Sequence, residues 1–368
     1  MALPLKDAFS ARAISVAWDN YKASLGETPY LGRTKFGTRK QNGLDLGFIK
    51  GQNSLPVTLK ATAFDAQAPL RDGIGFAKIE NEMPFFRESY MVTEKEEQDY
   101  ATFLEAANDS YANQVLSNIV KKPLDLIRGA QVVPERMIWQ LLAPVNGIPS
   151  IAVNIDGDTS KSYTIDYIEA SKQNAYKADH FIEIKGTSQW KNAATATPLD
   201  DLIKTKRDFA KASGYSLARF SMNTTTWEQI LACDDTKKQV MGAFAYSQGI
   251  RVRQQDVVAY LAEYGIEIEV YDKVYVDETG ATKSFIPDGY VSCQAAGVFL
   301  GDVVFGTTPE ERSYDTANGS LSIVETGIAV ATYTTPHPVN THCVCSEIVL
   351  PSFEGIDSVV TINANAGA

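Results

Sequence analysis

The feature that most constrains the fold is a long stretch near the N-terminus, residues 30–92, that contains strand-like segments. Within it, "PVTLKATAF" and "IGFAKIE" alternate between apolar and polar residues, which is typical of half-exposed strands. A connection of this length is uncommon in a compact domain unless it has a function of its own. We therefore expect a two-stranded excursion that leaves the body of the subunit and contacts another copy of the chain.

Such an excursion needs a surface to lie on, because an isolated two-stranded hairpin is at best marginally stable in water. Apolar side chains would supply the binding energy, at roughly 1.5–3 kcal/mol for each fully buried one. Basic side chains would orient the contact, since exposed ion pairs contribute only about 0–1 kcal/mol each. The candidate inter-subunit contact residues are Lys50, Leu55, Val57, Lys60, Phe64, Arg71, Phe76, Phe85 and Phe86.

A long amphipathic helix is predicted to follow from Glu94. Thr93 can cap it, acidic residues crowd its first turn, and apolar residues recur at spacings of three and four as far as Ile119. Pro123 is expected to kink or restart this helix. Pro134 is expected to begin a further helical segment, "PERMIWQLLA".

The remaining segments indicate a mixed α and β protein whose helices and strands are segregated more than alternating. A helix is predicted over residues 10–25, and residues 149–195 have the pattern of strands and turns. Helices resume at "PLDDLIKTKRDFAKASG", with Gly214 as the expected C-cap. Short strands then lead to a C-terminal region, residues 321–362, that is mostly strand.

Composition and charge exclude several classes of function. The chain has 44% apolar and 21% charged residues, and no signal peptide is expected. No apolar run reaches the length of about 18 residues that a membrane span needs. A net charge of −11 argues against a protein that grips nucleic acid, because that affinity comes from Lys and Arg. Residues 1–60 nevertheless carry nine Lys/Arg against four Asp/Glu. This basic arm either binds an acidic surface on another copy or is simply solvated.

The segment "PHPVNTHCVCSEIV" gathers His337, His342, Cys343 and Cys345 and is the best candidate for a metal site. If this segment forms a strand, the two cysteines point to one face and His342 to the other. A structural zinc site normally has four ligands, and this geometry leaves at most two on one face. We therefore expect no metal and no cofactor, and we interpret the cysteines as buried core residues.

No catalytic residue is predicted either. The sequence lacks a phosphate-binding loop, a nucleophile elbow and a His-Glu-x-x-His motif. Asp200 and Asp201 stand at the start of a helix, where the helix dipole favours acidic residues. His180 has no Cys or His close to it in the sequence, so we expect it to be solvated or hydrogen bonded and not a general base.

Four stretches of sequence together carry a resemblance to a known family. They are "YLGRTKFGTRKQNGLDLGFIKG" with the following "LPVTLKATAFDAQAPLRDGIGFAKIENEMPFFRES", then "GTSQWKNAATATPLDDL", "IEIEVYDKVYVDETGATKSFIPDGYVSC" and "TYTTPHPVNTHCVCSEIVLPSFEGIDSVVTINA". In this order they cover most of residues 30–368. They resemble the major capsid protein E family, the lambda-type major capsid proteins of tailed bacteriophages. In that family the cysteine positions of the last stretch belong to strands and are not ligands.

The resemblance implies an α+β protein with the Hong Kong 97 capsid fold. Residues 1–45 would be the N-terminal arm and residues 46–92 an extended E-loop. Residues 93–197 and 301–368 would form the peripheral domain, with the helix from Glu94 as its spine helix. Residues 198–300 would form the axial domain. The nine candidate contact residues would then lie in or next to the E-loop.

The resemblance also implies the major capsid protein of a tailed bacteriophage, a structural protein and not an enzyme. Copies would assemble as hexamers and pentamers into an icosahedral shell around the double-stranded DNA genome, which they would contact weakly and non-specifically. The expected partners are further copies, a scaffolding protein, a portal and a decoration protein, and no membrane is expected. The protein would assemble in the cytoplasm of the bacterial host and reside in the virion capsid.

Two alternatives stay open at this point. The first is an encapsulin-like nanocompartment shell protein, which has the same fold but encloses cargo enzymes. The second is a metal-dependent enzyme that uses His337, His342, Cys343 and Cys345. Electron microscopy separates the second from the others, since capsid and nanocompartment proteins form shells.

Overall fold

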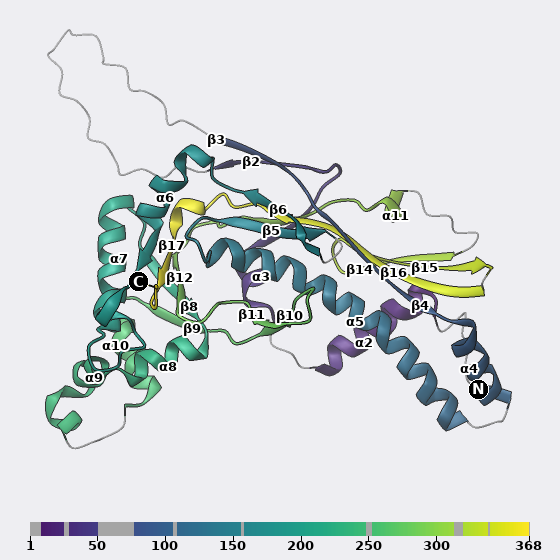
Figure 1. Cartoon of the computed structure of the whole chain (residues 1–368), viewed down its shortest axis with the longest axis horizontal. Coiled ribbons are helices and arrows are strands. Elements are labelled where there is room, and N and C mark those ends of the chain that lie inside the picture. Colours follow the sequence, from purple (N-terminus) through teal and green to yellow (C-terminus); the bar gives the residue numbers. More distant parts are fainter. Residues whose placement is uncertain are drawn as a thin grey trace, which may run out of the picture. The chain divides into compact units, whose positions relative to one another are not determined.

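The computed structural model describes residues 9–25, 29–50, 77–105, 109–155, 158–247, 252–312, 319–337 and 339–367. The chain divides into two compact units, and most of their elements are labelled in Figure 1. The first unit comprises residues 1–46, 80–137 and 302–352, and the second comprises residues 47–79, 138–301 and 353–368. Each unit thus combines segments that are far apart in the sequence. The domain boundaries expected from the sequence stay a prediction.

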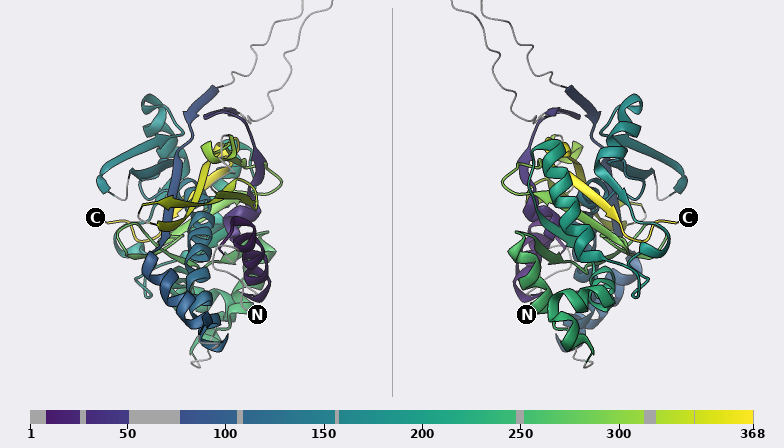
Figure 2. Two further views of the ribbon diagram at one scale, coloured as in Figure 1. Left: turned by 90° about the vertical axis from the view of Figure 1, so that its right-hand side faces the viewer. Right: turned by 90° about the vertical axis from the view of Figure 1, so that its left-hand side faces the viewer.

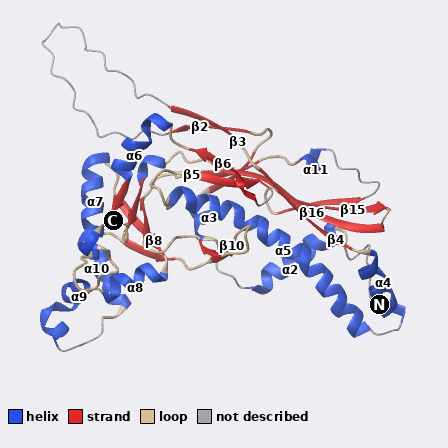
Figure 3. Ribbon diagram, viewed as in Figure 1, coloured by secondary structure: helices blue, strands red, loops and turns tan. Residues whose placement is uncertain are grey.

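The first unit is built on a six-stranded sheet with the strand order β1-β13-β16-β15-β14, in which β4 also pairs with β16. The strands are β1 Gly37–Lys40, β4 Phe85–Val92, β13 Asp302–Phe305, β14 Gly319–Val324, β15 Ile328–Pro336 and β16 Val339–Pro351. Strand β16 is the central strand, because it pairs antiparallel with β15, β4 and β13. Figure 3 shows β4, β15 and β16 running together. The strands predicted near the C-terminus are confirmed.

Helices α2 and α5 pack against one face of this sheet. The helices of the first unit are α2 Ala11–Leu25, α3 Leu31–Lys35, α4 Glu94–Glu105, α11 Pro309–Arg312 and most of α5 Asp109–Leu142. Ile14 of α2 and Ile127 of α5 are buried in one cluster with Val330, Cys343 and Cys345 of the strands. Figure 2 shows α2 beside α5. The helix predicted over residues 10–25 is therefore confirmed, and its apolar face is part of the core.

Helix α5 continues through both of its prolines, Pro123 and Pro134. The prediction that Pro134 begins a separate helical segment is therefore wrong, and no new helix starts at Pro123. A proline in a helix interior removes one backbone donor and costs about 3 kcal/mol. Both prolines are buried. Leu124 and Ile127 after Pro123, and Met137 after Pro134, are buried core residues. Tertiary packing of this face offsets the local cost.

The second unit is built on a five-stranded sheet with the order β7-β17-β12-β8-β9. The strands are β7 Phe181–Glu183, β8 Leu217–Met222, β9 Glu267–Val270, β12 Tyr290–Ala295 and β17 Val359–Asn363. Strand β12 is antiparallel to both of its neighbours, whereas the two edge strands run parallel to theirs. Phe220, Cys293 and Val360 of this sheet are buried in one cluster with Trp190 and Leu202.

Five α-helices accompany this sheet in the described part of the second unit. They are α6 Gln173–His180, α7 Pro198–Ser213, α8 Thr224–Ala232, α9 Asp234–Ser247 and α10 Gln254–Glu263, with short 3-10 helices at Ala170–Lys172, Gly186–Ser188 and Ile356–Ser358. Gly214 caps α7 with a left-handed φ of 79°, as predicted. Helix α6 lies within residues 149–195, for which only strands and turns were predicted. Its sequence "QNAYKADH" is mostly polar, so no apolar periodicity revealed it.

Three two-stranded sheets complete the fold. They pair β5 Ser150–Ile155 with β6 Asp158–Asp166, β10 Val274–Val276 with β11 Thr282–Ser284, and β2 Asp45–Lys50 with β3 Ala77–Glu82. The last pair joins the two ends of the expected excursion, while residues 51–76 between them lie outside the described residues. Among the described helices, none has both the length and the apolar character that crossing a membrane requires.

Candidate assembly surfaces

The histidines and cysteines around residue 340 do not converge on one site. Strand β16 buries Cys343 and Cys345 against the helices, which confirms their predicted core role. His342 points to the opposite face, where its ring stacks on Tyr333 with a centroid distance of 4.9 Å, and His337 is exposed beyond the end of β15. Burial raises the pKa of the Cys343 thiol to about 12, so at neutral pH it is protonated and is a poor metal ligand.

The nine candidate contact residues fall partly within the described structure. Lys50 ends β2, and Phe85 and Phe86 begin β4, where they pair with Ile348 and Glu347 of β16. Phe85 is 42% exposed, so it is available for a contact with another chain. The other six lie outside the described residues, and their role stays a prediction: Leu55, Val57, Lys60, Phe64, Arg71 and Phe76.

The sheet face opposite the helices exposes large apolar side chains. Because side chains alternate along a strand, Phe85 and Met91 of β4, Tyr333 of β15 and Ile323 of β14 share this face. Between 37% and 48% of each residue's surface is exposed. Apolar side chains that are exposed on one face of a sheet make that face a candidate for contact with another protein. We call this face the outer face. Sequence reasoning missed Met91, Tyr333 and Ile323, because the face on which each lies depends on the register of β4, β15 and β14 in the sheet.

A hollow of about 350 Å³ lies within the outer face. Its floor is made of small or short side chains, Ser89 of β4, Val344 of β16 and Ala331 of β15, which are direct partners across the three strands. Arg87, which forms an ion pair with Glu310, lines the same hollow. Short side chains on the floor allow another chain to approach the sheet closely, between charged groups that can orient it.

Glu325, in the turn between β14 and β15, fastens both core helices to the sheet. Its carboxylate accepts hydrogen bonds from Lys22 Nζ at 2.6 Å, Gln131 Nε2 at 2.8 Å and Trp18 Nε1 at 3.4 Å. Burial acts to raise the pKa of Glu325, but these donors hold it below its usual value. Sequence reasoning missed this residue, because its partner Lys22 is 303 positions away and no local pattern connects the two.

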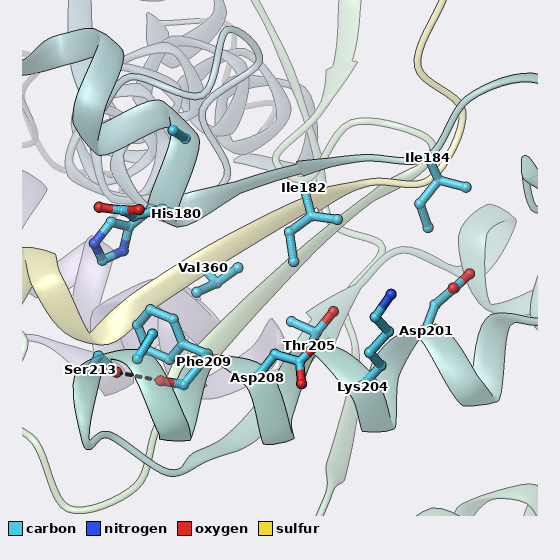
Figure 4. Close-up of a pocket in the computed structure, with 13 residues that line it drawn as sticks. His180, Ile182, Ile184, Asp201, Lys204, Thr205, Asp208, Phe209, Ser213 and Val360 are labelled. Atoms are coloured by element: carbon cyan, nitrogen blue, oxygen red, sulfur yellow. Dashed lines mark hydrogen bonds between the residues drawn. The ribbon is translucent and has the colours of Figure 1, made fainter.

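The second unit has a cavity of about 570 Å³ between α7 and the sheet (Figure 4). Ile182 and Val360 supply apolar lining, and α7 contributes Asp201, Lys204 and Asp208. Asp201 is already engaged, because its Oδ2 accepts a hydrogen bond from the Trp190 indole N–H at 2.9 Å. This acidic side chain at the start of α7 therefore has a structural partner within its own unit.

His180, which also borders the cavity, is held by its own unit. Its Nδ1 lies 2.8 Å from the Val359 carbonyl oxygen, and its ring stacks on Tyr176 with a centroid distance of 4.2 Å. The ring edge also meets Phe209. The prediction of a hydrogen-bonded histidine is confirmed. In the described ranges of the chain, no group of three or more His, Cys, Asp or Glu side chains is placed to hold a metal ion.

Comparison with solved structures identifies the fold. A protein assigned as the capsid protein of a prophage of Escherichia coli CFT073 aligns over 99% of this chain and 99% of its own, with a TM-score of 0.55 and 13% identity. A phage-related protein from Bordetella bronchiseptica RB50 aligns over 95% of this chain and 96% of its own, with a TM-score of 0.51 and 12% identity. The expected Hong Kong 97 capsid fold is confirmed.

The sequence comparison places the chain more exactly. The family model of phage major capsid protein E matches residues 10–364, and the chain belongs to this family. No curated protein sequence matches it. As a capsid protein of a tailed phage it forms an oligomeric shell with further copies of itself and is a structural component of the virion.

Proposed function

We propose that copies of this chain assemble as hexamers and pentamers into an icosahedral shell that encloses double-stranded DNA. The observation that carries the proposal is the outer face of the six-stranded sheet, with its exposed Phe85, Met91, Tyr333 and Ile323. A shell subunit gains about 25 cal/mol for each Å² of such apolar surface that a neighbouring copy covers. Assembly therefore removes from water the surface that a single subunit leaves exposed.

In this proposal residues 46–92 act as the E-loop, and the part before β4 reaches a neighbouring copy, because β4 belongs to the subunit's own sheet. Pairing of β2 with β3 supports this role, because it holds the two ends of the excursion together as the stem of a hairpin. The contact residues predicted from the sequence would bury against that neighbour, except Phe86, which by strand alternation lies on the helix-covered face of its own sheet. Residues 1–45 would be the arm, residues 93–197 and 301–368 the peripheral domain, and residues 198–300 the axial domain.

The charge of the chain fits a container for DNA. A net charge of −11 favours weak, non-specific contact with a packaged polyanion, since tight binding requires many Lys and Arg side chains. A scaffolding protein, a portal and a decoration protein would complete assembly in the cytoplasm of the bacterial host. The chain itself would act as a structural protein without catalysis.

Sedimentation velocity of the purified full-length chain over a series of concentrations tests this proposal. We expect monomers or small rings at low concentration and large particles of one narrow size class at high concentration. Sedimentation as a monomer at every concentration, or as aggregates without a defined size, would contradict it.

A further inference from the structure

The hairpin β10–β11 of the second unit is a preorganised projection. Its strands form a two-stranded sheet of their own, which continues the chain beyond β9 (Figure 1). Asp277 fixes the turn, because its Oδ1 accepts hydrogen bonds from the backbone N–H groups of Thr279 and Ala281, both at 2.9 Å. Lys283 pairs with the other carboxylate oxygen at 2.6 Å. The turn is thus held by charge-assisted bonds within the hairpin itself.

Aromatic rings hold the root of this hairpin. The Tyr275 ring lies 4.9 Å from the Phe285 ring, and Phe285 stacks on Tyr271 at 5.9 Å. Tyr271 in turn stacks on Trp139 at 5.6 Å. One face of the hairpin is therefore attached to the core of its own unit.

The other face of the hairpin is apolar and exposed to solvent. Val274 and Val276 flank Tyr275 in the strand, so both point away from the aromatic contacts. They are 57% and 65% exposed, and Val270 at the end of β9 is 43% exposed. An isolated two-stranded hairpin is at best marginally stable in water. This hairpin is held in place by its own unit, so its exposed valines can bind a partner at little cost in conformational entropy.

The charge around the hairpin indicates the charge of the surface that would bind it. Between β9 and the end of β11 the chain carries five acidic and two basic residues, Glu267, Glu269, Asp272, Asp277 and Glu278 against Lys273 and Lys283. Two copies that met through this same face would repel each other. Helix α2, α3 and β1 carry six basic residues and one acidic residue. Three of the basic residues, Lys22, Arg39 and Lys40, form ion pairs within their own unit. Arg12 and Val16 are exposed one helical turn apart on α2. The chain therefore offers a basic and partly apolar surface elsewhere.

We propose that the valine face of the β10–β11 hairpin binds the basic surface of α2 to β1 in a neighbouring copy of the chain, and this inference rests on the proposed shell function. The contact joins two different surfaces, so it is a head-to-tail contact that closes into rings when the rotation between copies allows. The apolar contact supplies the affinity, and the opposite charges of the two surfaces orient the copies.

Substitution of the exposed valines tests the proposal. The variant carries Val274→Asp and Val276→Asp, and the control carries Val145→Asp at a valine of the same unit that is 59% exposed outside the hairpin. We expect both to keep the circular dichroism spectrum of the wild type. The concentration for half-complete assembly should rise at least tenfold for the hairpin variant, equivalent to about 1.4 kcal/mol. It should not change for the control. Assembly of the hairpin variant at the wild-type concentration would overturn the proposal.

Two further measurements keep the outcome clear if aspartate disturbs the hairpin. The milder pair Val274→Thr and Val276→Thr keeps branched side chains suited to a strand and should still weaken assembly. Hydrogen exchange of the wild type should be at least tenfold slower at the hairpin amides in particles than in free subunits, and equal exchange would overturn the proposal. A wild type that never assembles would contradict the shell function itself, whereas assembly that ignores the hairpin contradicts this inference alone.

Discussion

Two buried glutamates of the first unit should respond in opposite ways to the same substitution. Glu135 on α5 is fully buried, and its carboxylate accepts hydrogen bonds from the backbone N–H groups of Gly32 at 2.9 Å and Arg33 at 3.0 Å. Glu347 on β16 is 1% exposed, and neither of its carboxylate oxygens has a hydrogen-bond partner among the described residues. Burial raises the pKa of Glu347 well above its usual value, and the charge of Arg33 partly opposes this rise.

The expected changes in the free energy of unfolding follow from these two environments. Glu135→Met removes two hydrogen bonds and leaves two backbone N–H donors without their acceptor, at about 1–3 kcal/mol each, so a loss of about 3 kcal/mol is expected. Glu347→Met removes an unsatisfied buried polar group, whose penalty is about 1–3 kcal/mol. Methionine fills a similar volume, so this variant should be as stable as the wild type or up to about 2 kcal/mol more stable.

The pH dependence of Glu347→Met provides a second readout. Below the unfolded-state pKa of Glu347 both states are protonated, and this residue does not reduce the stability of the wild type. As pH rises toward the raised folded-state pKa, the unfolded state ionises first and the wild type loses stability. The variant lacks this loss. Its advantage over the wild type should therefore grow with pH, by at most about 1.4 kcal/mol per pH unit.

Urea unfolding of the wild type and both variants at about pH 5 and about pH 7.5 measures these differences. Protein concentrations below the onset of assembly are needed, because association stabilises the folded state. If Glu347→Met lowers stability as much as Glu135→Met at both pH values, then Glu347 has a partner in the folded protein and the reasoning is wrong.

Three further predictions concern the excursion, a tight turn and the attachment of the arm. Replacing residues 51–76 by a short Gly/Ser linker should leave a folded subunit that forms no shells, as judged by circular dichroism and ultracentrifugation, and normal shells would refute the role in assembly. Gly327→Ala should lower the free energy of unfolding by about 3 kcal/mol, because φ is +87° and an added Cβ would lie 2.4 Å from the Phe305 ring. Gly297→Ala, where φ is +70° but the space around the added Cβ is open, should lower it by only about 1 kcal/mol. Equal costs in thermal unfolding would show that the Phe305 contact is unimportant. Glu325→Gln should lower the free energy of unfolding by about 1 kcal/mol at neutral pH. The effect should shrink as pH falls through the lowered pKa of Glu325, because the wild type then loses the same charge. A difference from the wild type that grows in acid would contradict the role of the Glu325 carboxylate.

Local patterns in the sequence predicted the elements whose burial follows a simple period. The alternation around Cys343 and Cys345 correctly separated the core face of β16 from the face that carries His342. Gly214 was predicted as a helix end because only glycine readily adopts its left-handed conformation. These features depend on a few neighbouring residues, so one sequence is enough to predict them.

Other features depend on partners that are distant in the sequence. The bonds from Glu135 to the first turn of α3 span 103 positions, and Lys22 is 303 positions from Glu325. Nothing local indicates that Pro134 lies within a continuous helix, because the packing that offsets its cost comes from other segments. Residues 85–88 were predicted within the excursion, but they pair with β16 as part of the sheet. Register between distant strands is set by the whole core and not by either strand alone.

Cryo-electron microscopy of particles assembled from the full-length chain tests the central claim most directly. The account predicts closed shells in which five and six copies surround local symmetry axes. In these shells the outer face of each six-stranded sheet should be covered by density from a neighbouring subunit. Open sheets, filaments or shells in which Phe85, Met91 and Tyr333 remain uncovered would contradict it.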